Sequence, residues 1–164
     1  MKSGLTMRLD KSADILKALK AIGKKDVLVG IPESENVRDG DDIGNAAIGF
    51  INENGSPARN IPARPHLVLG VRGVQSETLP LLKSAAQAVL RGNDGIANRY
   101  LNQAGTLAMN AVKAYITNTA FVPLSPSTIR QRLSRGRAGD KPLIDTGKYR
   151  DSITYIVRDK DADS

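Results

Sequence analysis

The sequence predicts an α+β fold, in which several helices pack on one face of a small antiparallel sheet. Three observations favour this class. A long helix-period pattern covers residues 94–118, a β-branched run covers residues 25–31, and an alternating run covers residues 152–158. A chain of 164 residues is long enough for one hydrophobic core and short for two, so we expect a single domain over residues 1–164.

The first expected element is an amphipathic helix over residues 10–22, which ends at Gly23. The β-branched run follows directly and is bounded by Pro32, which predicts a buried strand. The helix has an apolar inward face and a basic outward face. The inward positions are Ala13, Leu16 and Leu19, with Ile15 and Ile22 beside them, and the outward positions are Lys11, Lys17 and Lys20.

A short helix is expected over residues 42–54, with Gly55 where it would end. Before it, residues 33–42 are acidic and turn-rich, which predicts a mobile loop. After it, residues 55–65 contain three prolines, so we expect an extended, solvent-facing segment without regular strand pairing. The apolar residues that give the short helix its spacing are Ile43, Ala46, Ala47, Phe50 and Ile51.

The segments between the prolines and the long helix are less regular. Residues 66–71 are apolar, and their pattern fits either a short strand or an entry turn. A helix is expected over residues 78–90, with Pro80 in its first turn and Gly92 at its end.

Residues 94–118 are expected to form one long central helix, spanning about 37 Å at roughly 1.5 Å per residue. Asn93 or Asp94 is placed to cap its start, and Gly105 either weakens the helix or lets a neighbouring backbone approach closely. Its stripe contains no metal ligand, so we interpret it as a packing face rather than a cofactor site. The stripe consists of Ile96, Tyr100, Leu101, Ala104, Leu107, Ala108, Ala111, Val112, Tyr115 and Ile116.

A basic region follows the long helix. Ser125 and Pro126, a cap followed by proline at the first helical position, open a basic helix that ends near residue 135. We expect residues 135–141 to form a flexible basic loop and residues 159–164 to form a frayed tail.

Asp145 and Thr146 allow two interpretations. Either residue is placed to cap a single helical turn before the last strand. Asp145-Thr146-Gly147 also looks like the catalytic triplet of aspartic proteases, in which two such aspartates, one from each subunit of a dimer, share a proton. Only 17 residues follow Gly147, which leaves no room for the flap hairpin and second apolar segment of that fold, so we favour the cap.

Charge is unevenly distributed along the chain. Residues 31–60 hold two arginines against six acidic residues, whereas residues 121–150 hold seven basic residues against two acidic ones. Opposite patches of this kind suit head-to-tail contact between identical subunits. A basic nucleic-acid-binding accessory protein is the alternative, but no zinc finger, RNA-binding aromatic pair or recognition helix accompanies the arginines.

Composition excludes several classes of site. The chain has no cysteine and a single histidine, so we expect no disulfide, no metal centre and no cofactor. His66 has no acid or nucleophile beside it in sequence, and we interpret it as a packed or hydrogen-bonded residue. We read no signal peptide and no apolar run long enough for a membrane. Aromatic residues make up only 4% of the chain, so assembly is expected to supply part of the stability.

Three stretches occur in a distinctive order. They are AAIGFINENG at 46–55 running into IPARP at 61–65, PLS at 123–125 with Thr128 and Arg132, and PLIDTGK at 142–148 running to Ser152 and Ile153. Together they resemble the neck or tail-completion proteins of tailed bacteriophages and prophages. In that family a helix ending in Glu-x-Gly leads to Pro-Ala-Arg-Pro-Phe, and a late Thr-Gly segment closes the domain. His66 stands where the family usually has Phe, and Tyr149 where it usually has Leu.

The resemblance implies a structural virion protein of the neck or tail, made in the host cytoplasm, with no catalysis. It implies a ring, commonly of about six copies, that joins the head connector to the tail and leaves a channel for DNA. The implied partners are other copies of the chain, a connector or head-completion protein, a tail terminator or tail-tube protein, and DNA that passes without sequence-specific binding. Candidates for subunit or partner contacts are Asp39, Asp41, Asp42, Arg59, Arg64, His66, Arg135 and Arg137, and candidates facing the channel are Arg130 and Arg132.

Overall fold

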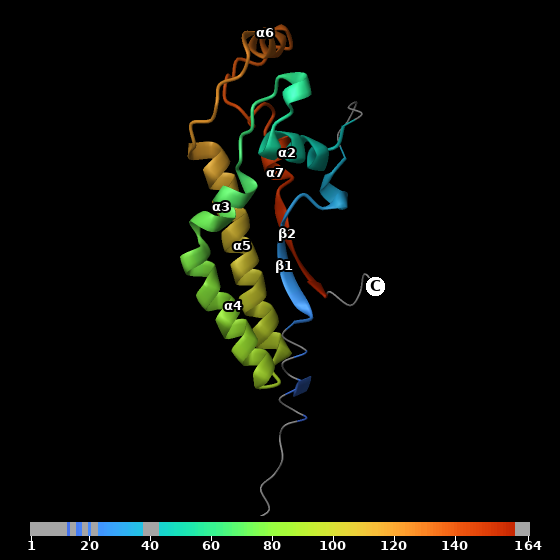
Figure 1. Ribbon diagram of the computed structural model, residues 1–164, viewed down its shortest axis with the longest axis vertical. Coiled ribbons are helices and arrows are strands. Elements are labelled where there is room, and N and C mark those ends of the chain that lie inside the picture. Colours follow the sequence, from blue (N-terminus) through green and yellow to red (C-terminus); the bar gives the residue numbers. More distant parts are fainter. Residues whose placement is uncertain (1–12, 14–15, 18–19, 21–22, 38–42, 160–164) are drawn as a thin grey trace, which may run out of the picture.

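Two antiparallel strands and six α-helices make up the part of the protein that the computed structural model describes, residues 13, 16, 17, 20, 23–37 and 43–159 (Figure 1). This confirms the predicted α+β class. The elements are β1 (Lys25–Gly30), α2 (Asn45–Asn54), α3 (Leu67–Gly73), α4 (Gln75–Leu90), α5 (Asp94–Asn118), α6 (Pro126–Ser134), α7 (Lys148–Asp151) and β2 (Thr154–Asp159), with 3-10 turns at Glu33–Glu35 and Pro57–Arg59.

The long helix α5 begins and ends at the predicted residues. Its start is fixed by Asn93, whose side-chain oxygen accepts a hydrogen bond from the backbone N–H of Ile96 at 3.1 Å. Ile96 itself is exposed, so the predicted stripe narrows at this end. The buried face follows three- and four-residue steps and consists of Ala97, Leu101, Ala104, Gly105, Ala108, Val112 and Ile116.

The sheet, α5 and α4 form successive layers, with α5 between the other two (Figure 1). β1 and β2 pair antiparallel, with Val27 opposite Val157 and Val29 opposite Tyr155. Tyr155 lies directly against α5 at Gly105, where an added Cβ would overlap the aromatic ring. The close approach expected at Gly105 is therefore made by a side chain of the sheet rather than by a backbone.

The hydrophobic core lies where the C-terminal half of α5 meets the sheet and α7. Its buried members are Val112, Ile116, Tyr149 and Ile153. Gly70 of α3 rests on this group, because a Cβ at Gly70 would lie 2.7 Å from the Cα of Val112. The core thus contains a single aromatic ring, as the composition suggested.

Two helices differ from the sequence prediction. Residues 66–71 form neither a strand nor a turn but enter helix α3, which begins at Leu67. Six residues are too few to identify a helix by periodicity, and the side chain that caps this helix comes from a distant part of the sequence, as described below. Helix α4 begins at Gln75, so Pro80 lies inside it and not in its first turn. The exposed ring of Pro80 interrupts one hydrogen bond without ending the helix.

Helix α2 is present as predicted, but its apolar stripe faces outward. Phe50 is 70% exposed, while Asn45 and Gly49 occupy the buried face. Gly49 is buried because the hydroxyl of Tyr149 packs against it, 3.0 Å from the position of an added Cβ. Periodicity identified the helix correctly but could not show which face would be covered.

The proline-rich segment 55–65 is more ordered than expected. Its first half forms the 3-10 turn Pro57–Arg59, which an isolated antiparallel bridge between Ser56 and Ile61 closes. Its second half buries the side chain of Arg64. The prediction of an extended, solvent-facing segment is therefore wrong at these positions.

Several predictions fall outside the described residues. They include most of the helix over 10–22, the acidic loop residues Asp39, Asp41 and Asp42, and the tail beyond Asp159. The strand predicted over 152–158 is present as β2, which begins two residues later than expected.

Candidate functional site

The three stretches that carry the family resemblance meet at one end of the molecule, around α2, α7 and the segment before α6. Four residues with polar side chains form the centre of this region, and we call them the polar cluster: Glu53, Arg64, His66 and Tyr149. They come from α2, the proline-rich segment, the residue before α3, and α7 (Figure 1).

Glu53 caps helix α3 from a different element. Its carboxylate accepts hydrogen bonds from the backbone N–H groups of His66, Leu67 and Val68, at 2.7, 2.9 and 3.1 Å. Burial raises the pKa of Glu53, but these bonds and the neighbouring imidazole outweigh it and leave the pKa below its usual value. The charged carboxylate thus satisfies the positive end of α3.

His66 is fully buried and joins the other members of the cluster. Its Nδ1 lies 2.7 Å from the carbonyl oxygen of Arg64, and because a carbonyl only accepts, Nδ1 carries the proton. Nε2 is then the acceptor for the hydroxyl of Tyr149. Burial lowers the pKa of His66, against the opposing effects of the Arg64 carbonyl and Glu53, and burial raises the pKa of Tyr149.

In space, the side chains of Glu53, His66 and Tyr149 follow one another as in a carboxylate–histidine–hydroxyl relay. Nδ1 of His66 lies 3.2 Å from the Glu53 carboxylate. The hydroxyl, however, is packed against Gly49 of α2. The contacts therefore connect α2, α3 and α7 with one another. His66 is hydrogen-bonded, as the sequence suggested. Because its side chain is fully buried, it is not available for contact with a second subunit, and that prediction is corrected.

Arg64 is also buried, with only 5% of its surface exposed. Its guanidinium donates hydrogen bonds to the carbonyl oxygens of Val122 and Pro123, at 2.8 and 3.0 Å. Burial lowers the pKa of Arg64. The predicted role of Arg64 at a subunit interface is thus corrected, because the side chain instead fixes the turn between α5 and α6.

Arg132 organises the basic loop. One terminal nitrogen donates hydrogen bonds to the carbonyl oxygens of Gly139, Lys141 and Ile144, at 3.1, 3.0 and 3.0 Å. Its side chain is only 12% exposed, so its hydrogen bonds are made within its own chain, and a position facing a channel stays a prediction. This one guanidinium therefore holds two carbonyls of the loop expected to be flexible, those of Gly139 and Lys141, and the carbonyl of Ile144 beyond it.

Asp145 lies between two guanidinium groups. One carboxylate oxygen is 3.6 Å from Nε of Arg132, and the other pairs with Arg137. Gly147 occupies the cap position of α7 with a φ of 84°, while the hydroxyl oxygen of Thr146 accepts a hydrogen bond from the backbone N–H of Lys148 at 3.4 Å. The predicted capping is therefore made in part by Thr146 and not by Asp145. The carboxylate that suggested a protease triplet is therefore committed to the basic loop, and Arg137, a predicted interface residue, is its partner.

The remaining predicted cations face outward. Arg59, Arg130 and Arg135 are exposed, and the last two flank the C-terminal half of α6. Arg132 and Arg137, predicted together with them, instead make contacts within their own chain. A role of the exposed arginines in binding stays a prediction.

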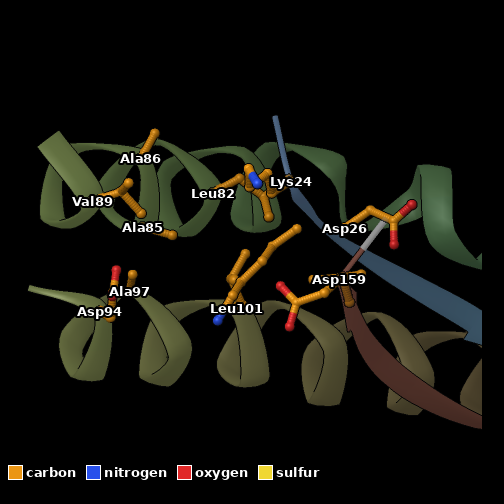
Figure 2. Close-up of a pocket in the computed structure, with 12 residues that line it drawn as sticks. Lys24, Asp26, Leu82, Ala85, Ala86, Val89, Asp94, Ala97, Leu101 and Asp159 are labelled. Carbon is orange, nitrogen blue, oxygen red and sulfur yellow. The ribbon is translucent and has the colours of Figure 1, made fainter. Parts of the chain in front are cut away.

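A groove that sequence reasoning missed lies between α4, α5 and the start of β1, with a volume of about 550 Å³ (Figure 2). Alanines on both helices form its floor, and this small-residue pattern was its only sequence signal. Lys24, Lys25, Asp26, Val27, Leu82, Ala85, Ala86, Val89, Asp94, Ala97, Leu101 and Asp159 line it.

Comparisons of the chain with protein-family models, curated proteins and solved structures find no match. Among the described residues, no helix has the length and apolar character that crossing a membrane requires. The same residues contain no group of three or more histidine or acidic side chains that could hold a metal ion.

Proposed function

We propose that the protein is a structural component of the neck of a tailed bacteriophage, where it forms a ring that joins the head connector to the tail around a DNA channel. The observation that supports this most is the connection of the three stretches. Arg64 of the first binds the carbonyl of Pro123 in the second, and Arg132 of the second binds the carbonyl of Ile144 in the third. Three short motifs that contact one another in the fold are less easily explained as separate chance matches than three unconnected ones.

The two departures from the family pattern support the same proposal. His66 replaces a usual Phe and Tyr149 a usual Leu, and these two side chains, 83 positions apart, are hydrogen-bonded to each other. In the proposed family, this hydrogen-bonded pair would stand at the positions where Phe and Leu are usual. Replacing both partners is tolerated where replacing one is not.

The outer surface suits assembly. Phe50 of α2 and Ile43 just before this helix are exposed, and Val37 is exposed nearby in the chain. Exposed apolar faces of this kind mark surfaces that contact another protein. The ring proposal gives these residues a partner and gives the exposed arginines of α6 a position near DNA.

Native mass spectrometry of the purified protein, alone and mixed with an extract that contains connector or tail-tube protein, tests the proposal. We expect a closed assembly of about six copies, and negative-stain images should show a central hole. A monomer or dimer that keeps its mass at high concentration and with these extracts would contradict it.

Duplex DNA binding by a lone monomer is the second candidate, and the exposed Arg130 and Arg135 favour it. In this case the monomer should bind DNA with strong salt dependence, and Arg130→Ser with Arg135→Ser should remove that binding. Arg72→Ser with Arg91→Ser is the matched control, since both residues are exposed on other elements. If both double variants bind DNA equally well, the α6 surface is not the DNA-binding surface.

A further inference from the structure

We propose that the groove between α4, α5 and β1 receives the N-terminal amphipathic segment, residues 10–22, of a second copy of this chain. The proposal rests on the proposed ring and names one of its interfaces. In Figure 2, Leu82, Ala85 and Val89 of α4 face Ala97 and Leu101 of α5 across the groove.

The groove has the character of a helix-binding surface. Its floor consists of the buried residues Ala85, Ala97 and Leu101, while Leu82 at its edge is exposed. Alanines on the floor let another helix approach closely, because interaxial distance depends on side-chain size. Amphipathic helices bind such grooves through apolar positions at three- and four-residue steps.

The segment 10–22 has the complementary pattern. Its predicted apolar positions include Ala13, Leu16 and Leu19, and its opposite face carries lysines. The exposed carboxylates of Asp94 and Asp159 line the groove, and Lys24 and Lys25 line it as well (Figure 2). A basic amphipathic segment would therefore place apolar side chains on the floor and lysines near carboxylates.

The exposure of two described positions on the segment favours a second copy as the occupant. Leu16, on the predicted apolar face, is 57% exposed, and Ala13 is exposed as well. Each chain thus has exposed apolar side chains at these two described positions of the segment and an open apolar groove elsewhere. When one surface of a protein binds a different surface of the next copy, the contacts are head-to-tail and close into a ring if the rotation permits.

Disulfide cross-linking tests this contact cleanly, since the natural chain has no cysteine. The full-length Leu16→Cys and Ala86→Cys variants are mixed under mild oxidation. We expect a covalent dimer that contains one of each, as identified by mass. The matched control is Leu79→Cys, which is exposed on α4 outside the groove and should not cross-link to Leu16→Cys.

A double variant, Leu16→Cys with Ala86→Cys, distinguishes the possible occupants. Linkage between copies should give a ladder of covalent oligomers. An internal disulfide within a monomer would overturn the proposal, because the segment would then occupy its own groove. Equal cross-linking of Leu16→Cys to Leu79→Cys would also overturn it, because the contact would be unspecific.

Native masses of the same samples separate this proposal from the proposed function. A ring that forms without the Leu16–Ala86 linkage overturns the groove contact and leaves the neck function standing. Specific linkage between copies that never close into a ring supports the groove contact and contradicts the neck function. Ala86→Arg should reduce the ring to monomers with unchanged helical content, whereas Leu79→Arg should leave it intact.

Discussion

The α4–α5 half of the molecule and the polar-cluster end are stabilised in different ways. Between α4 and α5, alanine, leucine and valine side chains pack without directional bonds. At the other end, Glu53, Arg64 and Arg132 hold backbone groups of distant segments through hydrogen bonds. Packing depends on volume and is shared by many residues, whereas each of these backbone groups depends on one side chain. Single substitutions should therefore be more damaging at the polar end.

The largest effect is expected for Arg64→Met, which keeps most of the volume but removes the bonds to Val122 and Pro123. Loss of two charge-assisted hydrogen bonds in a buried position should lower the free energy of unfolding by about 3 kcal/mol. Urea unfolding measures this change. Arg59→Met, an exposed position in the same segment, is the control and should stay within about 0.5 kcal/mol of the natural protein.

The pair His66 and Tyr149 should give the next largest effect, as a double-mutant cycle. His66→Phe or Tyr149→Leu alone leaves a buried polar partner without its bond, which should cost about 2 kcal/mol each. The double variant removes both partners of this bond, so it should cost clearly less than the sum of the two single losses. A cost of about 1–2 kcal/mol should remain, because the buried carbonyl of Arg64 still loses its donor, Nδ1 of His66. Additive losses in the cycle would show that the two side chains are not coupled.

Substitutions at two glycines of α5 test how much the packing of this helix contributes to stability. Gly105→Ala would push a methyl group into the ring of Tyr155 and should destabilise the protein by about 1–2 kcal/mol. Gly95→Ala meets no closer atom than Asn93 Oδ1, at 3.8 Å, and should be neutral or stabilising by up to about 1 kcal/mol. Thermal unfolding compares both with the natural chain, and equal losses would mean that helix propensity, not volume, decides.

The smallest effect is a loss of stability in acid, to which the polar cluster should contribute. Burial lowers the pKa of His66, so the unfolded chain binds the proton more readily than the folded protein. Stability should therefore fall as the pH drops below about 6.5, the ordinary histidine value. His66 is the only histidine, so the double variant His66→Phe with Tyr149→Leu should show no loss between about pH 6.5 and 5.

Glu53 extends the acid sensitivity to lower pH. Its folded-state pKa is lowered, so its contribution is complete above the unfolded value of about 4.3 and is lost as the pH falls below it. Chemical unfolding at a series of pH values measures both steps. If the double variant loses as much stability as the natural protein between about pH 6.5 and 5, His66 is not the group responsible for that loss.

The sequence by itself determined the elements whose signals are local. Periodicity predicted both ends of α5 and Asn93 its cap, and Ser125 and Pro126 predicted the start of α6. A β-branched run located β1 and an alternating run located β2. Such signals depend on residues within one or two turns of each other, so they can be read without the fold. The lone histidine was also understood correctly as a bonded residue.

Only the tertiary structure decided which polar side chains lie inside. His66 and Tyr149 are 83 positions apart, and Arg64 binds carbonyls 58 and 59 positions away. The cap of α3 likewise comes from Glu53 in another helix, and the stripe of α2 faces solvent because Tyr149 packs on its other side. A burial or capping partner so distant in sequence is chosen by chain packing, whose free energy no local pattern contains.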